Sequence, residues 1–208
     1  MKLGDPQLLK SVLESLPPDQ QQMRYQAQGQ PAPQAYPPTD RMTRHQAALQ
    51  LLQNAQFTFK TLQEAECLAS LLANCFPEPD RVVKGLAELM FNAIEHGNLG
   101  IGYQMKAELC SQGSWSTEIQ HRLENPVFKC RSAEATLARK DGGVYIVVSD
   151  QGDGFDWKNY MKIDPARAGE IHGRGIAMAN SISFDKLTYN EKGNKAVAFV
   201  ADQSSLNW

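Results

Sequence analysis

The chain has 208 residues, 42% hydrophobic and 21% charged, which suits one ordinary domain with appendages. Lys and Arg number 21 against 23 Asp and Glu, and a formal net charge of −2 gives no basic footprint for nucleic acid. No apolar run approaches the roughly 20 residues of a membrane-spanning helix, and the four cysteines form no C-x-x-C pair. The sequence therefore predicts a cytoplasmic protein with reduced thiols that binds neither nucleic acid directly nor a membrane.

Two appendages precede the predicted domain. Residues 1–16 read as an amphipathic helix, with Asp5 as its cap and Pro6 at its first position. Its apolar stripe either docks on its own domain or contacts a second subunit or a partner. Residues 17–40 hold six of the eleven prolines and seven glutamines, a composition typical of a flexible linker. The folded domain is expected at 41–208.

The domain is predicted to begin with helices. A helix is expected at 42–53 and a strand at 57–60. Thr61 and Glu64 form a capping box that opens a helix to about residue 75. Asp80 is expected to cap a second helix that ends near Gly97, and two short helices, 103–111 and 115–123, are expected within an insertion at 98–131.

Strands dominate the second half. Strands are expected at 133–139 and 144–149, joined by an Asp141-Gly-Gly turn, and a C-terminal hairpin pairs 184–189 with 196–201 through Gly193-Asn194. A helix at 175–182 lies between these two units. Helices grouped early and strands grouped late indicate an α+β fold rather than an alternating βαβ sheet.

The first candidate site is the helical segment Glu88-Leu-Met-Phe-Asn92-Ala-Ile-Glu-His96-Gly97. Glu88, Asn92 and Glu95 or His96 recur at helical spacing and share one face. A solvated helix face would by itself explain such a trio. However, Asn is a weak helix former, and its carbonyl oxygen can ligate Mg²⁺ without adding negative charge beside phosphates.

The second candidate site, Ser149-Asp150-Gln-Gly152-Asp-Gly154-Phe155-Asp156, follows the most apolar predicted strand. Gly152 and Gly154 keep the backbone clear of side chains. Asp150, at the end of the strand, can accept a hydrogen bond from an exocyclic amine such as adenine N6. A plain Gly/Asp turn is the alternative, and the aspartate spacing does not match an EF-hand.

The third candidate site, His172-Gly173-Arg174-Gly175-Ile176, opens the helix predicted at 175–182. Glycines before a helix let its free N–H groups approach an anion, which the helix dipole also favours. Arg174 adds a guanidinium fork for phosphate oxygens. No strand precedes the segment, so it is not a dinucleotide-binding fingerprint.

Taken in this order, the three segments resemble the N, G1 and G2 boxes of the Bergerat-fold ATPases, which include gyrase, histidine kinases and mismatch-repair ATPases. Glu88-x-x-x-Asn-Ala-x-x-His-Gly and Asp150-x-Gly-x-Gly-Phe are similar to bacterial anti-sigma-factor serine/threonine kinases. The resemblance covers about residues 57–201. It implies a two-layer α/β sandwich with a mixed, mostly antiparallel sheet, helices on one face, and ATP beneath a lid at 157–171.

The resemblance also implies roles for individual residues. Asn92 would bind Mg²⁺, Glu88 would be the general base for a substrate hydroxyl, and Asp150 would read adenine. The other implied nucleotide-binding residues are His96, Gly152, Gly154, Phe155, His172, Gly173, Arg174, Gly175 and Ile176. The implied partners are a small STAS-domain anti-anti-sigma protein as substrate, a sigma factor, and a second copy of the chain in a homodimer.

The chain departs from this family in two places. The insertion at 98–131, with Trp115 and Phe128, is expected to rebuild the lid or a partner surface. The family often has Thr where the last strand begins, whereas Lys195 and Ala196 stand there in this chain.

Three functions are consistent with these features. The first is an ATP-dependent serine/threonine kinase in a partner-switching circuit, because Glu88 accompanies Asn92. The second is a non-catalytic ATP-gated module that binds a regulatory protein. The third, a histidine kinase phosphorylated on His45, lacks the following acidic residue and the long dimerisation hairpin that such a protein would need.

Overall fold

The computed structural model describes residues 45, 47–140, 142–161 and 175–202. The predicted N-terminal helix and linker lie outside these residues, as do Asp141, most of the predicted lid, and the candidates His172, Gly173 and Arg174. Residues 45 and 47–49 are helical, within the helix predicted at 42–53. No helix in the described part of the chain is long and apolar enough to cross a lipid bilayer.

The first half of the domain is mostly helical, as predicted. It contains strand β1 (Asn54–Phe59), helices α4 (Leu62–Ala73) and α5 (Pro79–Asn92), the π-helical segment η1 (Ala93–Asn98), and the insertion helices α6 (Tyr103–Ser111) and α7 (Trp115–Glu124). Strand β1 begins three residues before the predicted start.

The second half holds most of the sheet. It contains strands β2 (Ala133–Lys140) and β3 (Gly143–Ser149), the 3₁₀ turn η2 (Trp157–Tyr160), helix α8 (Gly175–Met178), the π-helical segment η4 (Ala179–Ser183), and strands β4 (Lys186–Tyr189) and β5 (Lys195–Ala201). The predicted helix at 175–182 is thus formed by α8 and η4 together.

The starts of α4 and α5 are determined locally. Thr61 Oγ1 accepts the N–H of Glu64 (3.1 Å) and Glu64 Oε2 accepts the N–H of Thr61 (3.0 Å), so the predicted capping box is confirmed. The predicted cap at Asp80 is wrong. Helix α5 starts at Pro79, two residues before the start that a cap at Asp80 implies, because a residue without an N–H suits the first helical position. Asp80 lies in the first turn, where its charge favours the helix dipole.

The sheet has the order β1-β2-β3-β5-β4, and all four described strand pairs are antiparallel. The expected α+β sandwich is confirmed, but the expectation of a mixed sheet is wrong for these strands. The reason lies in the connection between β1 and β2. Helix α4 carries the chain back along β1 and α5 returns it, so β2 starts beside the end of β1, with Ala133 opposite Phe59.

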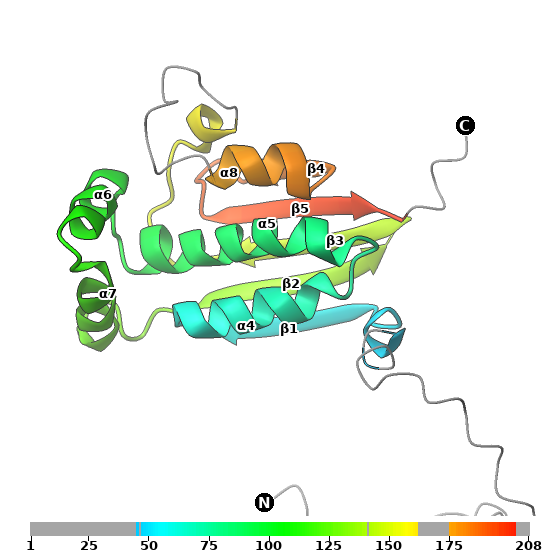
Figure 1. Ribbon diagram of the computed structural model, residues 1–208, viewed down its shortest axis with the longest axis horizontal. Coiled ribbons are helices and arrows are strands. Elements are labelled where there is room, and N and C mark those ends of the chain that lie inside the picture. Colours follow the sequence, from blue (N-terminus) through cyan, green and yellow to red (C-terminus); the bar gives the residue numbers. More distant parts are fainter. Residues whose placement is uncertain (1–44, 46, 141, 162–174, 203–208) are drawn as a thin grey trace, which may run out of the picture. The chain divides into compact units, whose positions relative to one another are not determined.

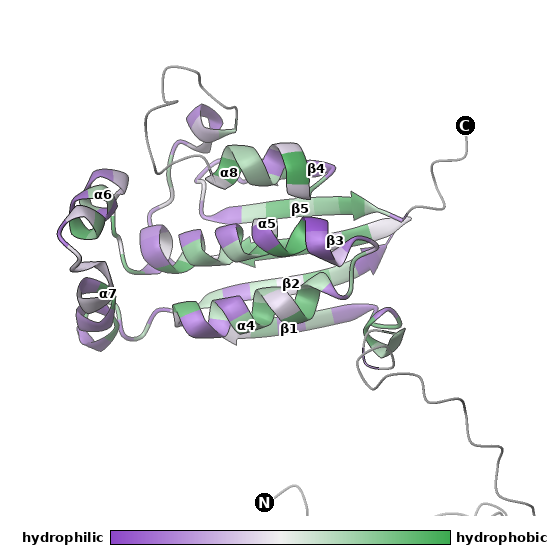
Figure 2. Ribbon diagram, viewed as in Figure 1, coloured by the Kyte–Doolittle hydropathy of each residue, from purple (hydrophilic) through white to green (hydrophobic). Residues whose placement is uncertain are grey.

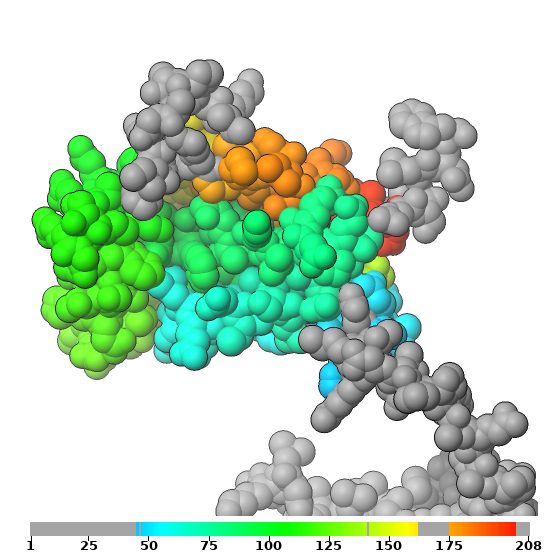
Figure 3. Space-filling model, in the orientation of Figure 1, coloured from blue at the N-terminus to red at the C-terminus, as the bar shows by residue number. Residues whose placement is uncertain are grey.

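Helices α4, α5 and α8 cover one face of the sheet (Figure 1), and the core lies between these layers. Along β3, Val144, Ile146 and Val148 are buried beneath the helices, whereas Tyr145 and Val147 point to the other face and are half-buried. Apolar and polar residues alternate along α4 and α5 (Figure 2), as expected for helices that bury one face. The insertion helices α6 and α7 gather at one end of the helical layer (Figure 3).

Candidate functional site

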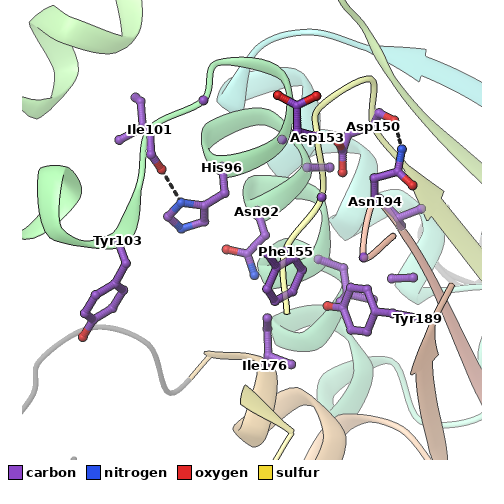
Figure 4. A pocket seen from close by; sticks show the side chains of 18 of the residues that line it. Asn92, His96, Ile101, Tyr103, Asp150, Asp153, Phe155, Ile176, Tyr189 and Asn194 are labelled. Carbon is purple, nitrogen blue, oxygen red and sulfur yellow. Dashed lines mark hydrogen bonds between the residues drawn. The ribbon is translucent and has the colours of Figure 1, made fainter. Parts of the chain in front are cut away.

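A cavity of about 640 Å³ opens between the helical layer and the sheet. Its wall combines α5 and η1, the loops after β3, the start of α8, the β4–β5 hairpin and the insertion (Figure 4). This volume falls in the range of ligand pockets, which is roughly 300–1,000 Å³. Eight predicted site residues line it: Glu88, Asn92, His96, Asp150, Gly154, Phe155, Gly175 and Ile176. Gly152 is a predicted residue that is not on the wall.

Helix α5 presents its polar face to the cavity, as predicted. The side-chain amide of Asn92 donates a 3.0 Å hydrogen bond to Glu88 Oε1. This bond holds the carboxylate one helical turn from the amide and leaves Asn92 Oδ1 without a partner among the described residues. One turn further on, His96 Nδ1 lies at hydrogen-bond distance from the carbonyl oxygen of Ile101, so the imidazole is tied to the start of the insertion.

Asp150 lies where β3 ends, at the floor of the cavity. Its Oδ1 accepts the N–H of Gly152 (2.8 Å), and its own N–H donates to the carbonyl of Asn194 (3.0 Å). Burial raises the pKa of Asp150 to about 6, against the opposing effects of the Gly152 N–H and the positive charges of Lys192 and Arg131. At neutral pH the group is therefore an ionised acceptor in a half-buried place.

The glycines around Asp150 are required by close backbone approaches. A Cβ on Gly152 would lie 2.3 Å from the carbonyl oxygen of Gly97, so Gly152 sits behind the wall and supports Asp150. Gly154 has φ +79°, and a Cβ there would lie 1.8 Å from the carbonyl oxygen of Lys192. The loop therefore packs directly onto the β4–β5 hairpin.

Gly175 brings the start of α8 against α5. A Cβ on Gly175 would lie 1.7 Å from Glu88 Oε1, so any larger residue would require the Glu88 carboxylate to move. Ile176, next in the chain, adds an apolar contact to the wall. Of the predicted third segment, these two residues are described and both reach the cavity.

The insertion forms a part of the wall that sequence reasoning did not assign. Five of its side chains line the cavity: Ile101, Tyr103, Lys106, Phe128 and Arg131. Lys106 forms an ion pair with Glu95, which is 1% exposed, and Arg131 donates to the carbonyl of Asn98 (3.0 Å) while lying 5.4 Å from the Phe128 ring centroid. Phe128 therefore lies on the cavity wall, and the expectation that the insertion rebuilds the lid or a partner surface stays a prediction. Spacing alone offered no signal for Lys106 or Arg131.

The β4–β5 hairpin supplies Tyr189 and Asn194, which were also missed. Asn194 Nδ2 donates to the carbonyl of Asp150 (3.3 Å), and the hairpin turn is held by Asn190 Oδ1, which accepts the N–H of Gly193 (2.9 Å). The polar pattern of the hairpin turn was visible in the sequence, but its closeness to Asp150 was not.

A two-layer sandwich with a cavity between such a helix and a Gly-rich loop after a strand defines an ATP-binding domain of the Bergerat type. A family model described as the histidine kinase-like ATPase domain matches residues 45–199, and the chain belongs to this family. The cavity is accordingly the candidate site for ATP. No curated protein matches the chain significantly.

Proposed function

We propose that the protein is an ATP-dependent serine/threonine protein kinase of the anti-sigma-factor type. In this proposal it acts in the bacterial cytoplasm, within a partner-switching circuit. It phosphorylates a STAS-domain anti-anti-sigma protein and also binds a sigma factor, as a homodimer. The four cysteines, all free, suit a reducing compartment.

The observation that carries this proposal is the pairing of Glu88 with Asn92. Binding a nucleotide does not need a carboxylate beside the amide, whereas phosphate transfer to a hydroxyl benefits from one. Glu88 is held by the Asn92 amide at 3.0 Å and faces Gly175, at the start of the helix assigned to the phosphates. This contact supports a role for the carboxylate as the base for an acceptor hydroxyl near the terminal phosphate.

The proposed reaction is a displacement at the γ-phosphorus. The serine or threonine oxygen of the substrate forms a bond to phosphorus, the bond from phosphorus to the β,γ-bridging oxygen breaks, and ADP leaves with that electron pair. Glu88 accepts the hydroxyl proton. The N–H groups at the start of α8 and the fixed cavity wall orient the nucleotide, because this reaction depends mainly on positioning and charge stabilisation.

The residues present fit a magnesium ion held chiefly by the nucleotide. Asn92 Oδ1 is a hard oxygen donor with no other partner in the described chain, and Mg²⁺ commonly takes one or two protein ligands together with phosphates and water. No cluster of three or more His, Cys, Asp or Glu suited to a metal occurs among the described residues. The ion would neutralise phosphate charge.

The test is phosphate transfer from labelled ATP to STAS-domain proteins of the same organism. We expect transfer by the wild type, and a loss of about 100-fold or more in Glu88→Gln, since a general base typically contributes about 100-fold to 10,000-fold. ATP binding by Glu88→Gln should persist. Equal transfer by this variant would refute the assignment of the base.

A second candidate function, an ATP-gated protein-binding module without catalysis, is favoured by the insertion. Lys106 and Arg131 of the insertion line the cavity, so a bound nucleotide would contact the insertion. The same insertion contains α6 and α7, which are largely exposed to solvent. ATP-dependent partner binding without phosphate transfer would support this alternative over the kinase.

A further inference from the structure

Tyr189 lies at the end of β4, opposite Ala196 of β5, and both residues line the cavity. Its ring is fixed on two sides. Phe155 meets it edge-on at 5.4 Å between centroids, and Trp157 stacks on it at 5.7 Å. Trp157 is itself anchored through a 3.0 Å hydrogen bond from its indole N–H to the carbonyl of Asn190. The position of the phenol is therefore set by packing rather than by its hydroxyl.

The hydroxyl of Tyr189 is buried and has no hydrogen-bond partner among the described residues. A buried hydroxyl without a partner is unfavourable, and native proteins keep few such groups. Figure 4 shows the phenol directed towards the cavity, beside Phe155 and Ile176. A polar atom in this place, held there by aromatic packing, indicates a partner that arrives with the ligand.

Three other polar side chains of the cavity have partners within the fold. The Asn92 amide N–H donates to Glu88, the Asn194 amide N–H donates to the carbonyl of Asp150, and His96 Nδ1 is engaged by Ile101. Burial and the carboxylates of Glu88 and Asp150 raise the pKa of Tyr189 above its ordinary value, so the phenol stays protonated and able to donate.

We infer that Tyr189 is a nucleotide-binding residue whose hydroxyl donates a hydrogen bond to an oxygen of the bound nucleotide, on its sugar or its α-phosphate. Asp150 is assigned to the adenine, and Glu88 and Gly175 are assigned to the terminal phosphates. Tyr189 is close enough to both carboxylates for each to raise its pKa, so it lies beside the middle of the nucleotide. The inference depends on nucleotide binding, which the proposed function also requires, and not on phosphate transfer.

The test compares Tyr189→Phe with the wild type in two measurements, the Tm of the free protein and the Kd for ATP by calorimetry. The substitution keeps the ring contacts and removes only the hydroxyl. We expect the Tm of the free protein to stay equal or rise, and the Kd for ATP to increase about twofold to tenfold, as the loss of one hydrogen bond predicts. Tyr145→Phe is the matched control, because Tyr145 packs on Phe199 at 4.6 Å outside the cavity.

Adenosine, AMP and ATP then locate the acceptor. If the substitution already increases the Kd for adenosine, the acceptor oxygen lies on the sugar. If the Kd increases only for AMP and ATP, the acceptor oxygen lies on the α-phosphate. An unchanged Kd for all three ligands overturns the inference while leaving the proposed function intact. A lower Tm of free Tyr189→Phe with no specific loss of ligand affinity also overturns it, because the hydroxyl would then have a structural partner. Failure of the wild type to bind any nucleotide would overturn the proposed function as well.

Discussion

Gly97 and Asp150 are in direct contact, although Gly97 belongs to the π-helical segment η1 and Asp150 directly follows the central strand β3. A Cβ at residue 97 would lie 2.3 Å from Asp150 Cγ and 2.5 Å from its Oδ1. The absence of a side chain at Gly97 thus determines where the carboxylate can sit in the candidate ATP site.

Gly97→Ala should displace Asp150 and weaken ATP binding at least about tenfold, since a hydrogen bond to a charged group contributes about 1.5–3 kcal/mol. The measurement is the Kd by calorimetry. Gly102→Ala is the control: Gly102 also lines the cavity, but a Cβ there would meet nothing within 4 Å. Similar Kd values for the two variants would show that the contact does not position Asp150.

Asp150→Asn should make the free protein more stable at neutral pH. The folded-state pKa of Asp150, about 6, exceeds its ordinary value of 3.8. Between about pH 4 and 6 the folded state thus holds a proton that the unfolded chain has released, so stability falls as the pH rises through this window. Asn cannot ionise and keeps an oxygen for the Gly152 N–H.

We therefore expect a higher Tm for Asp150→Asn than for the wild type at pH 7.5, and a difference that shrinks towards pH 4. The stabilisation by added ATP should nevertheless decrease, because a neutral amide is a weaker acceptor than a carboxylate. A lower Tm of the variant at pH 7.5 would contradict a cost of burying this carboxylate.

ATP affinity should decline below about pH 6 as Asp150 becomes protonated. Burial raises this midpoint, and the positive charges of Lys192 and Arg131 lower it. Arg131→Gln is expected to move the midpoint upwards, and Arg131→Lys, which keeps the charge, should leave it near the wild-type value. Comparing all proteins with the same ligand at each pH cancels the titration of the phosphates. Identical midpoints would exclude this electrostatic role.

Gly154→Ala should destabilise the fold more than Gly113→Ala. Both glycines have positive φ, +79° and +68°, so each substitution incurs the left-handed backbone cost of about 1–2 kcal/mol. Only at Gly154 would the new Cβ also collide with backbone, 1.8 Å from the Lys192 carbonyl oxygen. Thermal unfolding of the two variants measures the difference. Equal losses of Tm would show that the loop relaxes freely.

Local signals in the sequence predicted most elements. The Thr61–Glu64 capping box, the two insertion helices and both hairpins depend on residues close together in the chain, and the structure contains all of them. Prediction failed where two local signals competed. Pro79 and Asp80 both favour the start of a helix. The helix begins at Pro79, because proline, which has no N–H, fits the first helical position.

The sequence by itself determined the helices and strands, the polar face with Glu88 and Asn92, and the loop that carries Asp150, because these follow from periodicity and spacing within short segments. Only the tertiary structure decided that the sheet is antiparallel throughout its described strands, that Arg131 shares a cavity with Asp150, and that Tyr189 points its hydroxyl into it. These relations join segments far apart in the chain. They arise when apolar faces are buried together, and no local pattern encodes which distant side chains that packing will place side by side.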